Sequence, residues 1–126
     1  MGTSKEYSIV YEIKGKVFEI RSTGLLGESA GQEFEQRVNY GLEQKLRHFV
    51  FDFGHAKSIS SPAIASILNS TEAIVEEHKG KVCLTGLTEL NLKVFEMVGI
   101  LLSAEVCVTL PEAEIRVLLE DTQKKD

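Results

Sequence analysis

The stretch FVFDFGHAKSISSPAI, residues 49–64, joins an apolar run to a small polar segment and then to the start of a helix. Residues 49–53 form a continuous apolar run, which is typical of a strand covered on both faces of a sheet. The polar residues that follow predict a short loop, and Pro62 predicts the first turn of a helix, where its missing N–H does no harm. A buried strand, a loop and a helix in this order form the unit from which parallel α/β sheets are built.

The segments before this stretch predict a hairpin and a helix. Residues 7–13 and 16–21 are rich in β-branched and aromatic side chains, with a tight glycine turn between them. After a glycine-bearing connection at residues 23–27, Ser29 and Gln32 match a capping box that begins a helix. The apolar face of this helix is expected at helical spacing, at Ala30, Phe34, Val38, Gly41, Leu42 and Leu46.

The segments after the stretch predict three helices and two strands. The second helix is expected to end with Gly80 as its C-terminal cap, before a strand at residues 81–85. The third helix ends at Gly99 before a short strand at residues 105–108, and a second capping box begins the last helix at Thr109. The apolar positions expected to be buried are Ile64, Ile67, Leu68, Thr71, Ile74 and Val75, then Leu87, Leu90, Val94, Met97 and Val98, and finally Ile115, Leu118 and Leu119.

These elements predict an α/β fold with the order β-β-α-β-α-β-α-β-α. Strands separated by single helices pair in parallel through right-handed crossovers, whereas the opening hairpin adds one antiparallel strand. The sheet is therefore expected to be mixed, mainly parallel and five-stranded, with four helices. Residues 1–126 are expected to form a single domain, with a core over about 7–119 and a short polar tail.

The composition narrows the classes of function. The longest apolar runs, such as residues 98–102, are far too short for a membrane span, and no hydrophobic secretion signal leads the sequence. The net charge of −5 and the scattered basic residues argue against a nucleic-acid partner. Cys83 and Cys107 lie in apolar strand runs, which favours buried, reduced thiols. We therefore expect a cytoplasmic protein whose partner is a protein or a small molecule.

Signals for catalysis, cofactors and metals are weak. Residues 24–27 lack the glycine pattern of a dinucleotide site, and the three histidines lack metal-ligand spacing with each other or with the cysteines. A Ser-His-Asp catalytic triad could be assembled from Ser61, His55 and Asp52. However, the sequence around Ser61 lacks the nucleophile-elbow pattern of such enzymes. The sequence therefore predicts a protein that is not an enzyme, with no catalytic residue, no metal site and no cofactor.

Ser61 allows two interpretations. As the residue before Pro62 it is well suited to be the N-cap of the second helix, a role worth about 1 kcal/mol of stability. The same position lies beyond the end of a parallel strand, where open α/β sheets place their ligands, and a helix N-terminus favours an anion there. A phosphoryl group on Ser61 would add a charge of about −1.5 to −2 to an accessible surface. The sequence leaves both roles open.

Several local patterns resemble the STAS domain, the module shared by sulphate transporters and bacterial anti-sigma factor antagonists. In that family a strand leads through a short loop to Asp-Ser-Ser/Thr-Gly at a helix start, and residues 60–63 (SSPA) occupy that place. Other segments of the family resemble four parts of this sequence, namely residues 24–28, 81–87 and 94–100 and the helix start at Glu112. At the tetrapeptide itself, serine stands in place of the family's aspartate, proline in place of its second hydroxyl residue and alanine in place of its glycine.

The resemblance implies a set of functional residues. Ser61 maps onto the family's phosphoacceptor, with Ser60 and Ser58 as alternative hydroxyls. The partner surface and switch loop would include Asp52, His55, Lys57, Ser60 and Pro62. Asp52 would accept hydrogen bonds from N–H groups of that loop.

The resemblance also implies a function. The protein would be a non-enzymatic regulatory module that resembles an anti-sigma factor antagonist. Its partner would be an anti-sigma factor that is also a serine-kinase-like ATPase. Phosphorylation of a serine would switch this interaction. Two alternatives stay open. The first is an accessory subunit of a transporter ATPase or signalling scaffold that works without phosphorylation. The second is a small binder of phosphate or a nucleotide. The sequence does not predict an oligomeric state.

Overall fold

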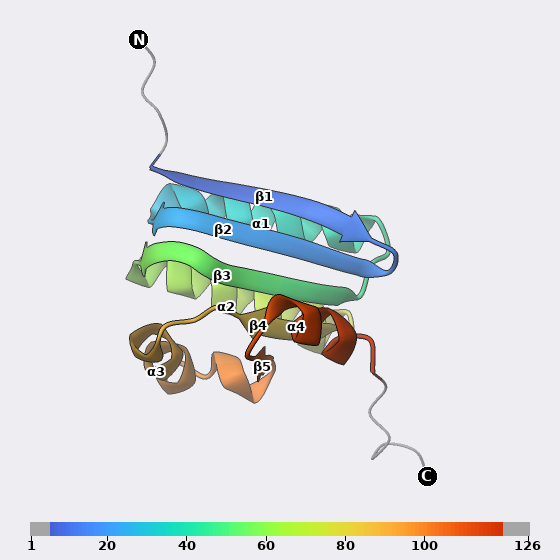
Figure 1. The fold of residues 1–126 in the computed structure, drawn as a ribbon. Coiled ribbons are helices and arrows are strands. Elements are labelled where there is room, and N and C mark those ends of the chain that lie inside the picture. Colours follow the sequence, from blue (N-terminus) through green and yellow to red (C-terminus); the bar gives the residue numbers. More distant parts are fainter. Residues whose placement is uncertain (1–5, 120–126) are drawn as a thin grey trace.

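The computed structural model describes residues 6–119, which form a five-stranded sheet with helices on both faces (Figure 1). The predicted tail after residue 119 lies outside the described residues. The elements in chain order are β1 (Tyr7–Lys14), β2 (Val17–Leu26), α1 (Glu28–Glu43), β3 (His48–Ile59), α2 (Ser61–Glu72), the π-helical turn η1 (Ala73–Glu77), β4 (Lys81–Thr85), α3 (Glu89–Met97), the 3₁₀ turn η2 (Ile100–Leu102), β5 (Glu105–Cys107) and α4 (Leu110–Arg116).

The strands lie in the order β1-β2-β3-β4-β5. β1 and β2 are antiparallel, with Tyr7 opposite Gly24 and Lys14 opposite Val17, and the remaining neighbours are parallel. The predicted mixed, mainly parallel sheet and the predicted order of elements are therefore confirmed. Residues 23–26, predicted as a connection, instead continue β2 as far as Leu26.

The first face of the sheet packs against α1 and α2 (Figure 1). All six phenylalanines of the protein are buried, and all belong to this cluster. Phe34 of α1 meets Phe51 of β3 edge-on with ring centroids 4.7 Å apart, and Phe53 meets Phe95 of α3 in the same way at 5.6 Å. Edge-to-face aromatic pairs add to the stabilisation that burial provides. This face holds most of the hydrophobic core.

Within residues 6–119 the second face is covered by α4 alone, and it carries a small cluster. Its members are Val17, Val50, Cys83, Cys107, Ala113 and Val117. Both cysteines are buried and free, as the sequence predicts. Burial raises the pKa of the Cys83 thiol to about 12, so it is protonated at neutral pH.

The two short C-terminal helices present faces other than the predicted ones. On α3, Leu90 and Met97 are 72% and 83% exposed, whereas Phe95 is fully buried. On α4, Ile115 is 65% exposed and Leu118 and Leu119 beyond it are also exposed, while Ala113 and Val117 are buried. A helix of two or three turns has too few apolar positions to fix its rotation, so packing against the sheet decides which side is buried.

Helix ends agree with the prediction at α4 and differ at α1 and η1. Thr109 Oγ1 accepts a hydrogen bond from Glu112 N at 3.3 Å, which confirms the predicted cap. α1 begins one residue before Ser29, with Gly27 as N-cap and no side-chain cap, so the predicted capping box is wrong. Lys79, rather than Gly80, has the left-handed backbone that ends a helix. Gly80 is needed for a different reason, because a Cβ there would lie 2.5 Å from Arg47 O.

Candidate functional site at the start of helix α2

The segment predicted as a polar loop is the second half of β3. Beyond Asp52, β3 continues to Ile59, with His55 opposite Thr23 and Ile59 opposite Leu26 on β2. The register shifts twice along this pairing, each time with an extra residue on β3, so the extension is bulged. β4 ends at Thr85, opposite Asp52. Among the described strands the extension therefore pairs with β2 alone, and this tertiary pairing overrides the polar composition that predicts a loop.

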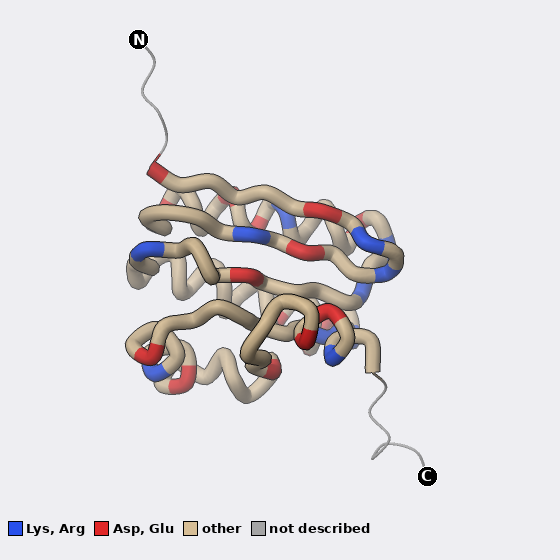
Figure 2. Tube along the Cα trace, in the orientation of Figure 1, with Lys and Arg blue, Asp and Glu red and all other residues tan. Residues whose placement is uncertain are grey.

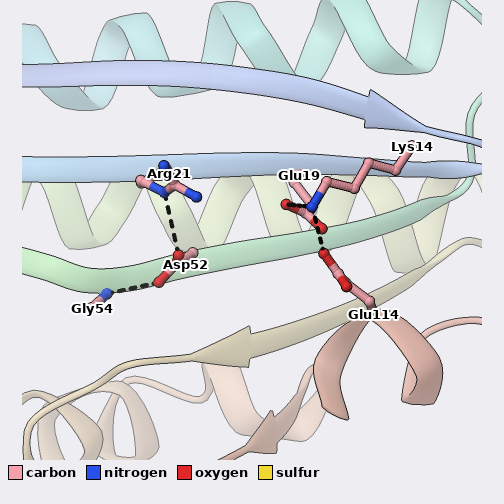
Figure 3. A network of polar contacts seen from close by, with 6 residues as sticks. All are labelled: Lys14, Glu19, Arg21, Asp52, Gly54 and Glu114. Atoms are coloured by element: carbon pink, nitrogen blue, oxygen red, sulfur yellow. Dashed lines mark hydrogen bonds and ion pairs between the residues drawn. The ribbon is translucent and has the colours of Figure 1, made fainter. Parts of the chain in front are cut away.

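Asp52 holds the start of this extension (Figure 3). Gly54 N donates a hydrogen bond to Asp52 Oδ1 at 2.9 Å, as predicted for a loop N–H, although Asp52 lies within β3 rather than at its end. Asp52 Oδ2 also lies 3.5 Å from Arg21 Nε on β2. The Asp52 carboxylate thus accepts the Gly54 N–H at the bulge. Its ion pair with Arg21 also links β3 to β2 at the point where the register first shifts.

Two glycines bring the ends of β3 and β4 close together. Gly86, just after β4, has φ +83°, a conformation that side chains other than glycine rarely adopt. A Cβ on Gly86 would lie 2.4 Å from Gly54 N. The backbone after β4 therefore passes directly against the bulge in β3, which fixes the position of the segment that leads into α2.

Ser60, rather than Ser61, caps α2. Ser60 is extended, with φ −78° and ψ 167°, and its Oγ accepts a hydrogen bond from Ala63 N at 3.4 Å. Ser60 N donates to Leu26 O at 2.9 Å, which fixes this residue at the end of β2. Pro62 consequently takes the second helical position instead of the first. The predicted N-cap role of Ser61 is wrong by one residue.

Ser61 is left exposed at the first position of α2. Within residues 6–119 its side chain makes no hydrogen bond, so its hydroxyl is free to react or to bind. Ser58 and Lys57 are also exposed, on the β3 extension, and Pro62 is exposed beside Ser61. Of the three serines near the helix start, Ser58, Ser60 and Ser61, only Ser60 makes a side-chain hydrogen bond within residues 6–119.

An apolar groove of about 230 Å³ runs between α2 and α3 and begins at Ser61. Its remaining lining residues are Ile64, Ala65 and Leu68 of α2, Val94 of α3 and Val98, the residue just after α3. The third apolar stripe, predicted to be core, therefore supplies one wall of this groove. The sequence contains a signal for it: α2 carries Ile64 and Leu68 in addition to the Ala63 and Ile67 that fill the core, which is a wider apolar surface than one buried face needs.

The possible catalytic set is not assembled. Asp52 bonds to Arg21 and Gly54, and no hydrogen bond joins Asp52, His55 and Ser61 to one another in the described chain. His55 is exposed on β3. Among residues 6–119 no three His, Cys, Asp or Glu side chains gather closely enough to hold a metal ion. No helix in this range is long and apolar enough to cross a membrane.

Charges of both signs are interspersed along the chain. Figure 2 shows Lys and Arg alternating with Asp and Glu over most elements of the fold. The groove itself is lined by apolar side chains and the Ser61 hydroxyl. Contact through the groove would therefore depend on apolar burial rather than on charge attraction.

Comparison with known proteins identifies the fold. No protein-family model matches the sequence, and no curated protein does either. Among solved structures, an anti-sigma factor antagonist from Mycobacterium paratuberculosis is 14% identical with a TM-score of 0.76, over 88% of this chain and 93% of that one. The phosphorylated form of SpoIIAA, a Bacillus cell fate determinant, is 20% identical with a TM-score of 0.71, over 87% of this chain and 99% of its own. Protein TM1081 from Thermotoga maritima is 19% identical with a TM-score of 0.76, over 86% and 93%.

These similarities cover most of each chain, and they agree with the strand order and helix positions described above. The unphosphorylated form of SpoIIAA, an anti-sigma factor antagonist, is also similar to this chain in structure. The chain therefore has the STAS fold, also called the SpoIIAA-like fold, which these anti-sigma factor antagonists share.

Proposed function

We propose that this protein is a non-enzymatic regulatory module that binds a protein partner through the α2–α3 groove, and that phosphorylation of Ser61 ends the interaction. The partner would be of the class that the fold suggests, an anti-sigma factor with serine-kinase activity. The observation that carries this proposal is an exposed serine hydroxyl, free of structural hydrogen bonds, at the edge of an apolar groove.

The groove is suited to a protein partner because its walls are apolar and accessible. Leu90 and Met97, on the same helix as the groove residue Val94, are 72% and 83% exposed, so α3 carries apolar surface outside the groove lining as well. Exposed apolar patches of this kind are uncommon on single proteins and often mark interaction sites. Burial of such side chains would contribute about 25 cal/mol for each Å² removed from water, against which the entropy cost of association counts.

A phosphoryl group on Ser61 would act on the complex and not on the fold. It would lie at the N-terminus of α2, where the helix dipole favours negative charge, so the free energy of unfolding should change little. At the edge of an apolar interface the same charge would have to lose its hydration, which would weaken binding. The phosphorylated and unphosphorylated structures of SpoIIAA support the idea that this fold accommodates such a group.

The phosphate-binding alternative is less well supported by the geometry. Pro62 has no N–H, and the N–H of Ala63 already donates to Ser60 Oγ. The start of α2 therefore offers a free anion fewer backbone donors than an ordinary helix does. The accessory-subunit alternative uses the same groove and differs only in having no phosphorylation.

The experiment has two steps. The partner is first captured from the native host with the wild-type chain and identified together with any phosphorylated residue by mass spectrometry. Binding of the purified partner is then measured by titration calorimetry for Ser61→Asp and for Ser58→Asp, a matched exposed serine on β3. We expect Ser61→Asp to bind several-fold more weakly, with Ser58→Asp close to wild type.

A second pair of variants tests the groove itself. Val98 lines the groove and is 43% exposed, whereas Val106 on β5 is 42% exposed and lies outside it. Val98→Asp should abolish binding, and Val106→Asp should leave it intact. Equal binding by both would show that the partner does not use the groove. Loss of binding in Val98→Asp with normal binding by Ser61→Asp would favour the accessory subunit.

A further inference from the structure

A three-residue ionic cluster joins α4 to the opening hairpin (Figure 3). Lys14, at the end of β1, lies with its Nζ 2.9 Å from Glu114 Oε2 on α4 and 3.4 Å from Glu19 Oε1 on β2. Glu114 is the α4 residue that reaches across to this part of the sheet. The cluster therefore joins α4 to the β1–β2 hairpin, which lies far from it in the sequence.

Glu19 is unusual because it is a carboxyl group buried beside another carboxyl group. The residue is only 5% exposed, and when Glu19 is ionised its Oε2 accepts no hydrogen bond among residues 6–119. Burial of an unpaired carboxylate oxygen is costly. Glu19 and Glu114 also share one ammonium, and two carboxylates that share a site do not both ionise readily. A proton on Glu19 removes both penalties, because it neutralises the buried group and provides a donor for Glu114.

Other charged groups around Glu19 are already engaged or exposed. Glu12 is its partner across the β1–β2 pairing and is exposed. Arg21, next on the same face of β2, pairs with Asp52 of β3. These groups and Glu19 line a small cavity of about 70 Å³. On the α4 side, Glu114 is the charged group that meets Glu19 and Lys14.

We propose that Glu19, Lys14 and Glu114 form a proton-dependent latch that holds α4 on the second face of the sheet. With Glu19 protonated, the cluster has one carboxylate and one ammonium, and α4 is held. With Glu19 ionised, two carboxylates compete for one lysine, and the hold on α4 weakens.

The pKa values place this change near neutrality. Burial, followed by the hydrogen bond with Glu114 and its charge, raises the pKa of Glu19 to about 7, against the opposing effect of Lys14. The hydrogen bond with Glu19 lowers the pKa of Glu114, so the proton resides on Glu19. The latch should therefore weaken as the pH rises through about 7.

A latch matters for α4 because the helix is short and its apolar anchor is small. It spans only Leu110–Arg116, and its contacts with the cluster are made by Ala113, the partly buried Leu110 and, just beyond its end, Val117. Arg116 also pairs with Glu105 of β5, but at 3.7 Å and between exposed side chains. Helices of this length are not stable by themselves. Beneath α4 lie Cys83 and Cys107, both buried. If α4 opens, these thiols become accessible, which provides a direct readout.

The test compares thiol labelling of the wild type, Glu19→Gln and the control Glu12→Gln in the full chain. Rates are measured about one unit below and one unit above the pKa of Glu19, about 7. All three proteins carry the same cysteines, so the effect of pH on thiol ionisation is the same in each. It therefore cancels when their labelling rates are compared at one pH. We expect equal rates at the lower pH, and several-fold faster labelling of the wild type and Glu12→Gln than of Glu19→Gln at the higher pH. Equal rates for all three at both pH values would overturn the proposal.

A measurement on the wild type alone guards against a variant that does not fold. The backbone amide signals of Leu110–Arg116 are followed by NMR across the same pH range. We expect them to shift together with the Glu19 side chain, at one midpoint. If Glu19 titrates and the α4 amides do not shift, there is no latch.

Discussion

The two faces of the sheet differ in the side chains packed on them and in the helices that cover them (Figure 1). Under α1 and α2 the first face holds six phenylalanines and most of the apolar core. Under α4 the second face holds two valines of the sheet, two cysteines and two small side chains of the last helix region, beside a buried glutamate. Because buried apolar area governs stability, the first face should carry most of the free energy of folding. The second face can then depend on conditions such as pH without unfolding the whole domain.

The candidate functional site belongs to the well-packed face. α2 is anchored in the core by Ala63 and Ile67, and the η1 turn that continues it by Ile74, while Ser61 lies at its exposed start. A charge placed on Ser61 therefore acts on a helix that is held firmly elsewhere. This separation is what a surface switch needs, because the modified and unmodified forms must both stay folded.

The largest effect is expected in the centre of the first face. Phe51 is fully buried and meets Phe34 edge-on. Phe51→Ala should lower the free energy of unfolding by about 3 to 5 kcal/mol, because it removes a large side chain and leaves a cavity. Chemical denaturation followed by circular dichroism measures this loss. A loss below about 1 kcal/mol would mean that the first face does not dominate stability.

The equivalent change on the second face should be smaller. Val50 is fully buried at the centre of the cluster under α4. Val50→Ala removes the equivalent of two methylene groups, so we expect a loss of about 1 to 2 kcal/mol in the same denaturation experiment. Val106→Ala, at a half-exposed valine on β5, is the control and should change stability little. A loss at Val50 as large as that at Phe51 would contradict the contrast between the faces.

The contrast also explains which parts of the fold can be predicted from the sequence. The first face follows from strong patterns: Phe49, Phe51 and Phe53 alternate along one strand, and Phe34 and Val38 share a face of a helix four turns long. The long helix fixes its own rotation, and the alternation fixes the side of the strand. The order of elements and the mixed sheet are predicted correctly for the same reason.

The candidate site and the second face depend on weaker signals. α3 and α4 are too short for spacing to show that Phe95 and Val117, rather than Leu90 and Ile115, are buried. The extension of β3 is polar and becomes a strand only because β2 continues beside it. The choice between Ser60 and Ser61 as cap depends on a hydrogen bond from Ser60 to the end of β2, which no local pattern reveals.

The dependence of stability on pH should come from the second face. The pKa of Glu19 is raised from 4.5 to about 7 in the folded protein, so its contribution to stability is fully present below about 4.5 and is lost as the pH rises through about 7. The lowered pKa of Glu114 acts in a separate window, because its contribution is lost only as the pH falls below 4.5. Glu19→Gln should therefore flatten the fall in melting temperature between these values, and Glu12→Gln should not. A fall of equal size in all three proteins would assign it to other groups.

The smallest effect distinguishes two adjacent serines at the start of α2. Ser60→Ala removes the oxygen that accepts from Ala63 N, but this bond is long at 3.4 Å, so the loss should be about 0.5 to 1 kcal/mol, near the low end for an N-cap. Ser61→Ala removes a hydroxyl that bonds to nothing within the described part of the chain, so stability should stay near that of the wild type. A local measurement separates the two more clearly than melting does: hydrogen exchange at the Ala63 amide should accelerate in Ser60→Ala and stay unchanged in Ser61→Ala. The opposite pattern would return the cap to Ser61 and tie up the hydroxyl that the proposed switch requires to be free. Unchanged exchange in Ser61→Ala, together with weaker partner binding by Ser61→Asp, would show that the residue serves the interaction and not the helix.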